Sequence, residues 1–162
     1  MNTYARTRDG RLRLPRAMSE AEILKVAEDL IEARYARETE LKDPADAREL
    51  IRAKLIGAER ELFLVLFLDQ RHRLIASEVM FQGTIDQAEV QPREVVKRAL
   101  HHNASALIMA HNHPSGYAEP STADMVLTKR LQEALALVQT RLLDHIVVGY
   151  PNITSMAERG ML

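Results

Sequence analysis

The sequence contains no cysteine, which excludes disulfide bonds, thiolate catalysis and every zinc site built on cysteine. That absence fits a cytoplasmic protein. Tryptophan is also absent and there are only three phenylalanines, which leaves little aromatic surface for stacking on nucleic-acid bases. No apolar run approaches the roughly 20 residues that a membrane-spanning helix requires, and residues 1–18 lack the apolar core of a signal peptide. The net charge of −1 argues against a basic surface over the whole protein.

Apolar residues occupy 46% of the 162 positions, which is enough to build the core of one globular domain. Residues 1–18 carry five arginines against a lone Asp9, and we expect them to form a flexible or loosely docked arm. Ser19 and Glu22 have the spacing of a capping box, which predicts that a helix begins there. A second helix is predicted over residues 43–57, with a proline in its first turn and a glycine at its end.

The rest of the chain alternates between strand and helix patterns. Residues 61–69 are almost wholly apolar, as expected of a strand that is covered on both faces of a sheet. Further strands are predicted over 74–83, 105–113, 142–151 and a short segment after 152, and amphipathic helices over 91–104 and 121–139. Because two strands follow each other directly and the others alternate with helices, we predict an α/β (α+β) fold. Helices sandwich its mixed β-sheet, and a helical N-terminal segment precedes it.

Two histidines stand one residue apart at the carboxyl end of the predicted strand 105–113. Side chains two apart on an extended backbone point to the same side, so His111 and His113 can reach one ion. After a loop with two prolines and a glycine, Ser121 and Asp124 fall in the first turn of the next helix. Two imidazole nitrogens and a carboxylate oxygen make three protein ligands, and a catalytic zinc site keeps its fourth position open for water. The sequence therefore predicts a metal site.

Simpler explanations of the same residues stay open. Ser121 and Asp124 also match a capping box, which needs no metal. His145 opens a predicted strand and is expected to be a hydrogen-bonded structural residue rather than a ligand. His101 and His102 follow one another at the end of a helix, where the helix dipole favours cations, and both are expected on the surface.

The spacing of these candidate ligands also matches a known motif. His-x-His, seven residues, Ser, two residues and Asp occur at His111, His113, Ser121 and Asp124, which resembles the JAMM motif of the JAB1/MPN metalloprotease domain. The segments "QGTID", "AEVQPREVVKRAL", "HNHPSG", "PSTAD" and "DHIVVG" are similar to the RadC branch of that family. The resemblance covers residues 45–162.

The resemblance implies a zinc ion as cofactor, a cytidine-deaminase-like layered fold and hydrolysis of peptide or isopeptide bonds. Residues 1–44 would then form a basic arm and an N-terminal helix, followed by the JAB1/MPN (RadC-like) domain. Longer chains of the RadC type carry a helix-hairpin-helix segment before this domain. The first 57 residues do not show its glycine-rich hairpin, which weakens the association of this chain with DNA repair.

A hydrolase of this kind also needs a carboxylate as general base and acid. The resemblance implies a glutamate at the start of an apolar strand well before the histidines, and Glu61 matches that placement. Glu78, in the neighbouring predicted strand, is the alternative. Glu61 is favoured because a strand buried on both faces has its polar residue at its end. Ser121 would then donate a hydrogen bond to the developing oxyanion.

The leading hypothesis is a zinc-dependent metallohydrolase that acts on a peptide or protein substrate. The alternative is a RadC-type, DNA-repair-associated protein that binds nucleic acid without catalysis, with the arginine arm making weak, salt-sensitive phosphate contacts. A zinc deaminase is excluded, because its site needs cysteine ligands and a His-x-Glu motif. The intact motif argues against a degenerate, inactive member. The sequence predicts neither an individual substrate nor an oligomeric state.

Overall fold

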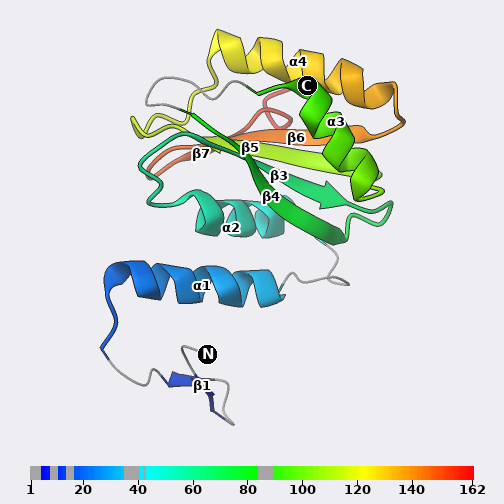
Figure 1. Cartoon of the computed structure of the whole chain (residues 1–162). Helices are drawn as coiled ribbons and strands as arrows, with labels where there is room; N and C mark the ends of the chain where they lie inside the picture. Colours follow the sequence, from blue (N-terminus) through cyan, green and yellow to red (C-terminus); the bar gives the residue numbers. More distant parts are fainter. Residues whose placement is uncertain (1–4, 8–10, 14–16, 35–40, 42, 84–89) are drawn as a thin grey trace.

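The computed structural model describes residues 5–7, 11–13, 17–34, 41, 43–83 and 90–162 (Figure 1). The first elements are β1 (Ala5–Arg6), β2 (Leu12–Arg13), α1 (Glu20–Arg34) and α2 (Pro44–Leu55). They are followed by β3 (Leu62–Leu68), β4 (Leu74–Gln82), α3 (Pro92–His101), β5 (Ala106–Asn112), α4 (Thr122–Ala136), β6 (Arg141–Val148) and β7 (Ile153–Ser155). Among these described helices, none combines the length and the apolar character needed to span a membrane.

Five strands form one mixed sheet in the order β4-β3-β5-β6-β7. β3 pairs antiparallel with β4 and with β5, β5 pairs parallel with β6, and β6 pairs antiparallel with β7. The parallel pair is joined through α4, because parallel neighbours need a long crossover connection. In Figure 1, α3 and α4 cover one face of the sheet and α2 lies against the other. The prediction of an α/β (α+β) fold with a mixed sheet between helices is therefore confirmed.

Alternate residues of the interior strand β3 enter two separate cores, because successive side chains point to opposite faces. The core beneath α2 includes Leu64, Leu66 and Leu68 of β3 with Leu50, Ile51 and Leu55 of α2. The core beneath α3 and α4 includes Phe63, Val65 and Phe67 of β3 with Val95, Ala99, Leu131 and Leu135. The face on which a strand residue lies therefore decides which helices it meets.

The start of α1 and both ends of α2 form as their sequence signals predict. Ser19 Oγ accepts the N–H of Glu22 at 3.3 Å, and Glu22 Oε2 accepts the N–H of Ser19 at 2.9 Å, which completes the capping box of α1. Asp43 caps α2, and Gly57 follows that helix with a φ of +75°. Glycine adopts this left-handed conformation without steric penalty, so the chain leaves α2 at the predicted position.

The described part of the N-terminal arm is a short β-hairpin, which its sequence pattern did not predict. β1 pairs antiparallel with β2. Thr7 donates its N–H and its hydroxyl to the Arg11 carbonyl, at 2.8 and 2.9 Å, and so adds to the contacts between the two strands. Arg11 and Arg13 are exposed, whereas Arg8 and Arg16 lie outside the described residues.

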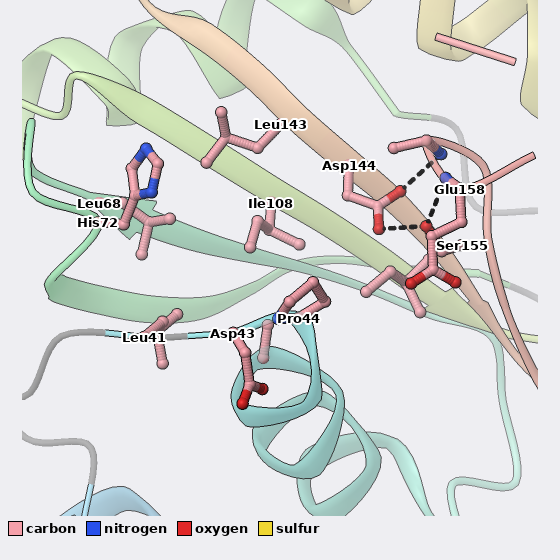
Figure 2. A pocket seen from close by; sticks show the side chains of 13 residues that line it. Leu41, Asp43, Pro44, Leu68, His72, Ile108, Leu143, Asp144, Ser155 and Glu158 are labelled. Atoms are coloured by element: carbon pink, nitrogen blue, oxygen red, sulfur yellow. Dashed lines mark hydrogen bonds between the residues drawn. The ribbon is translucent and has the colours of Figure 1, made fainter. Parts of the chain in front are cut away.

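A cavity of about 240 Å³ lies between α2 and the sheet (Figure 2). Most of its walls are apolar, and they include Leu68 and Ile108. Asp144 stands at one end, where its carboxylate accepts hydrogen bonds from the Ser155 hydroxyl at 2.6 Å and the Ala157 N–H at 3.0 Å. The Asp144 carboxylate is thus hydrogen-bonded within the fold.

Candidate metal centre

The carboxyl end of β5 brings two histidines to the face of the sheet beneath α4. His111 lies opposite Phe63 of β3, and because cross-strand partners share a face, it points toward the same core. His113 follows two residues later, and its Nε2 lies 3.0 Å from His111 Nε2. The side chain of His111 is 1% exposed and that of His113 is 20% exposed. The pair therefore extends from the core to the surface.

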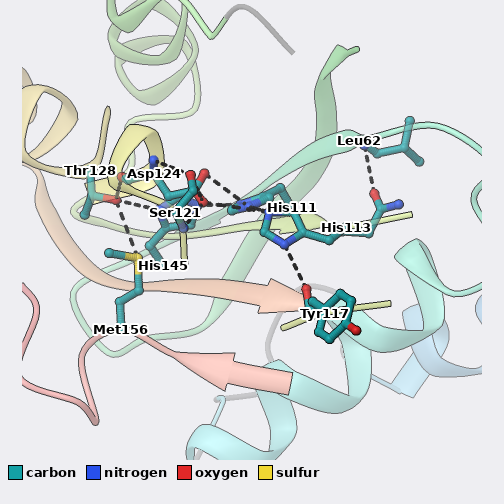
Figure 3. Close-up of polar contacts among 10 residues, drawn as sticks. Leu62, His111, His113, Tyr117, Ser121, Asp124, Thr128, His145 and Met156 are labelled. Carbon is teal, nitrogen blue, oxygen red and sulfur yellow. Dashed lines mark hydrogen bonds and ion pairs between the residues drawn. The ribbon is translucent and has the colours of Figure 1, made fainter. Parts of the chain in front are cut away.

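Asp124 reaches both histidines from the first turn of α4 (Figure 3). Its Oδ1 lies 3.3 Å from His111 Nε2, and its Oδ2 lies 3.7 Å from His113 Nε2. Within the described part of the chain, this is the only set of three or more possible ligands that lie together, with one atom of each within 4.8 Å of the others. The structure thus brings together the three residues that the sequence predicts as metal ligands, which we call the metal cluster.

The capping box of α4 is also formed, and it is compatible with the metal cluster. Ser121 Oγ accepts the N–H of Asp124 at 3.1 Å and donates to Asp124 Oδ2 at 2.7 Å. The Ser121 N–H donates to the same oxygen at 2.7 Å. Because Oδ2 takes both hydrogen bonds, Oδ1 is left facing His111. Ser121 thus orients Asp124, and a role at an oxyanion would require its hydroxyl to change acceptor.

The Nδ1 atom of each imidazole, on the side of the ring away from the metal cluster, lies within hydrogen-bond distance of a partner. His113 Nδ1 lies 2.8 Å from the Tyr117 carbonyl, which can only accept, so the neutral ring carries its proton there and keeps a lone pair on Nε2. His111 Nδ1 lies 2.9 Å from His145 Nε2. With protons on both Nδ1 atoms, two lone pairs and a carboxylate oxygen meet without a proton between them. That donor set fits a cation.

Burial and nearby charges set the ionisation of the surrounding groups. Burial, reinforced by the neighbouring histidines, lowers the pKa of His145 to about 3, so the ring is neutral at pH 7. Burial raises the pKa of Asp124, whereas the His111 ring, when it carries a proton on Nε2, and the hydrogen bonds from Ser121 lower it, so the pKa lies below its ordinary value. Asp124 is therefore an ionised carboxylate, the form that binds metals.

Two buried residues, His145 and Thr128, lie next to the metal cluster, and the sequence pattern assigns neither of them to the site. His145 was predicted to be a hydrogen-bonded structural residue, and it is fully buried against His111 and Thr128. The motif does not include Thr128. It lies four residues after Asp124, a spacing that places both on the same face of a helix and could have identified it.

Glu61 stands just before β3 and is half-buried. Asn112, between the two histidines, donates to the carbonyl that precedes Glu61 at 2.9 Å and accepts the N–H that follows it at 2.8 Å. Continuing the alternation of β3, Glu61 falls on the same face as Phe63 and His111. Glu61 is not one of the three residues of the metal cluster, so it is available for a role other than ligation.

Glu78, the alternative general base, is bound to α3. It accepts from Arg98 Nε at 2.7 Å and from a second nitrogen of the same guanidinium, and its Oε1 lies 2.6 Å from His102 Nε2. The hydrogen bonds from Arg98 lower the pKa of Glu78 against the effect of burial, whereas a general base works best with a pKa near the operating pH. His102 also packs on Phe67, with ring centroids 4.6 Å apart. The prediction that His102 is a surface residue is therefore wrong.

Known proteins are similar to this chain in sequence. A family model described as "RadC-like JAB domain" matches residues 41–161, which confirms the resemblance seen in the sequence. A "UPF0758 protein" of Cellvibrio japonicus is 62% identical over 122 residues, which are 75% of this chain and 54% of that protein. Another, from Vibrio atlanticus, is 52% identical over 140 residues, which are 86% of this chain and 62% of that protein. The chain thus spans little more than half the length of these curated relatives. Because the family model matches most of the chain, the protein belongs to the RadC-like JAB domain family.

Proposed function

We propose that this protein is a zinc-dependent metallohydrolase that cleaves peptide or isopeptide bonds. The observation that carries this proposal is the meeting of two histidine nitrogens and one carboxylate oxygen within 4.8 Å. Imidazole and carboxylate together suit zinc among the first-row ions. Three protein ligands leave a coordination position open, as catalytic rather than structural zinc sites do. Membership in a JAB domain family supports the same assignment.

A zinc ion at the metal cluster would supply Lewis-acid activation of water and of the substrate carbonyl. Residues of this chain would move the protons. Glu61 takes a proton from the attacking water as the water oxygen bonds to the carbonyl carbon of the substrate. Glu61 then returns this proton to the amine nitrogen as the C–N bond breaks. The Ser121 hydroxyl turns from Asp124 to the carbonyl oxygen, where negative charge develops.

A hollow beside His113 and a second hollow next to it support an extended, polymeric substrate. One, of about 300 Å³, is lined by residues that include His113 and Pro114. The other, of about 510 Å³, is lined by residues that include Tyr117. Gly116 and Tyr150 border both hollows. A substrate peptide that crosses these two residues would therefore contact both hollows, as expected of a peptide that extends beyond the cleaved bond.

The zinc-loaded protein is expected to hydrolyse members of a mixed library of linear peptides and lysine isopeptides. Mass spectrometry would detect product pairs that together contain one added water. Protein stripped of metal by a chelator should lose this activity and regain it when zinc is restored. His113→Ala protein, purified in the same way, controls for contaminating proteases. A library left uncleaved by the zinc-loaded protein would contradict the proposal.

Nucleic-acid binding without catalysis is the second candidate, favoured by the exposure of Arg11 and Arg13 on the β1–β2 hairpin. Deleting residues 1–18 is expected to weaken DNA retention at low salt, because basic side chains that contact phosphates release counterions. Zinc content should stay unchanged, since no residue of the arm belongs to the metal cluster. Gel shifts at two salt concentrations and elemental analysis measure both effects. Loss of zinc from the truncated chain would mean that the arm helps to build the site.

A further inference from the structure

We propose that His145 and Thr128 form a positioning pair, which holds a ring proton on His111 Nδ1 and so directs the His111 Nε2 lone pair into the metal cluster (Figure 3). This inference rests on the proposed metal site. It concerns two buried residues that are not members of that site.

A β-bulge brings His145 to the face of the sheet beneath α4. Leu142 and Asp144 lie opposite consecutive residues of β5, so Leu143 is an extra residue in the parallel pairing. An extra residue reverses the alternation of sides for the remainder of the strand. Leu143 and Asp144 both line the cavity on the α2 face, and His145 points to the opposite face. Without the bulge, His145 would face that cavity.

Asp144 holds the backbone of His145 from the α2 face. Its Oδ1 accepts the N–H of His145 at 2.8 Å. The same oxygen accepts the N–H of Ala157 at 3.0 Å, and Oδ2 accepts the hydroxyl of Ser155 at 2.6 Å (Figure 2). These bonds tie β6 to β7 and to the turn that follows it. The imidazole of His145 is therefore presented from a fixed backbone.

The ring of His145 has no access to water. It is 0% exposed, and its centroid lies 4.9 Å from that of His111 and 5.7 Å from that of Phe63. A ring in this position must satisfy both nitrogens within the protein. Nε2 lies 2.9 Å from His111 Nδ1, and Nδ1 lies 2.6 Å from Thr128 Oγ1.

The direction of each hydrogen bond follows from Thr128. Its Oγ1 lies 2.6 Å from the main-chain carbonyl of Asp124, which can only accept, so the threonine proton is committed there. The sulfur of Met156, at 3.7 Å, is a weaker acceptor. Thr128 must then accept from His145 Nδ1, which leaves the neutral His145 with a lone pair on Nε2. That lone pair accepts the Nδ1 proton of His111.

The opposite direction would block the metal cluster. If His145 donated from Nε2, His111 would accept at Nδ1 and carry its own proton on Nε2, where the ion must bind. The tautomer of a ligating histidine is set by the hydrogen bond on its other nitrogen. Such outer contacts typically change metal affinity by about 10–100-fold. The three hydrogen bonds run from the Asp124 carbonyl through Thr128 and His145 to His111 Nδ1. They therefore connect two residues of the metal cluster on the side away from the ion.

Thr128→Val removes the hydroxyl and keeps the volume of the side chain. The dissociation constant for zinc is expected to rise about 10–100-fold, because His145 loses the acceptor that fixes its orientation. Thr128→Ser retains the hydroxyl and should bind zinc as the wild type does. Competition with a chromophoric chelator measures all three proteins, with His101→Gln, which removes an exposed histidine, as the control. Valine and serine variants of equal affinity would overturn the proposal.

Nitrogen NMR of the metal-free protein separates this proposal from the proposed function. At about pH 8.5, where free imidazole is neutral, the wild type should show His111 protonated on Nδ1, and Thr128→Val should show the proton shifted to Nε2. A wild-type proton on Nε2 would overturn the positioning pair even if the valine variant did not fold. A wild type that shows the expected tautomer but binds no zinc would refute the metal site and leave the positioning pair in place.

Discussion

Replacing His113 with alanine is expected to abolish stoichiometric zinc binding, whereas the wild type should bind about one ion per chain. His113 is one of three residues in the metal cluster, and its ring is held by the Tyr117 carbonyl at 2.8 Å. Outer contacts to ligating histidines change metal affinity by about 10–100-fold, and the loss of a ligand should exceed that range. Elemental analysis after dialysis against a weak chelator measures the difference.

The His113→Ala protein should still fold, because this side chain lies at the partly exposed end of the metal cluster. Zinc at 100 times its dissociation constant would stabilise the wild type by about 2.7 kcal/mol, so its thermal midpoint should rise with zinc. The midpoint of the variant should not. His101→Ala, which removes an exposed histidine on α3, should behave as the wild type. Equal metal content in the wild type and His113→Ala would remove the basis for the site.

Glu61→Gln is expected to retain zinc but to lower the rate of hydrolysis by about 10²–10⁴-fold, because an amide cannot carry a proton from water to the amine. The glutamine keeps the size of the side chain and the main-chain contacts that Asn112 makes on either side of residue 61. Asp124→Ala should lose zinc and activity together. Single-turnover rates on zinc-loaded proteins, with metal content measured on the same samples, distinguish a base from a ligand.

Glu78→Gln makes the same chemical change on the neighbouring strand and serves as the matched control. Its activity should stay at the wild-type level, while the ion pair with Arg98 and the contact with His102 are lost. Because the folded protein lowers the pKa of Glu78, its carboxylate stabilises the fold above its ordinary pKa, and that stability is lost as the pH falls. The glutamine variant should lack this part of the acid dependence. An inactive Glu78→Gln with a fully active Glu61→Gln would make Glu78 the base.

The elements of the domain followed from local patterns. The apolar run 61–69 predicted a strand covered on both faces, and β3 is that strand. Asp43 and Gly57 predicted the ends of α2 within a few residues. Each signal depends on neighbours along the chain, whose effect on the backbone hardly changes with the surrounding fold.

The contacts of Glu78 and His102 could not be predicted in this way. Their ring and carboxylate meet across 24 positions of sequence, between β4 and α3. A histidine at a helix end is usually exposed, but here Phe67 of β3 lies beneath its ring. The packing of α3 on the sheet decides that His102 turns inward, because Phe67 and Glu78, which its ring contacts, both belong to neighbouring strands.

The sequence by itself determined where the candidate ligands lie. Alternation along a strand puts His111 and His113 on one side, and the cap at Ser121 orients Asp124, so both placements depend on residues a few positions apart. Only the tertiary structure decided which residues stand behind them. His145 meets His111 across 34 positions of sequence, and it does so because an extra residue in β6 shifts the pairing with β5. Strand register arises from contacts between distant segments, and a slip of one residue turns every following side chain to the other face.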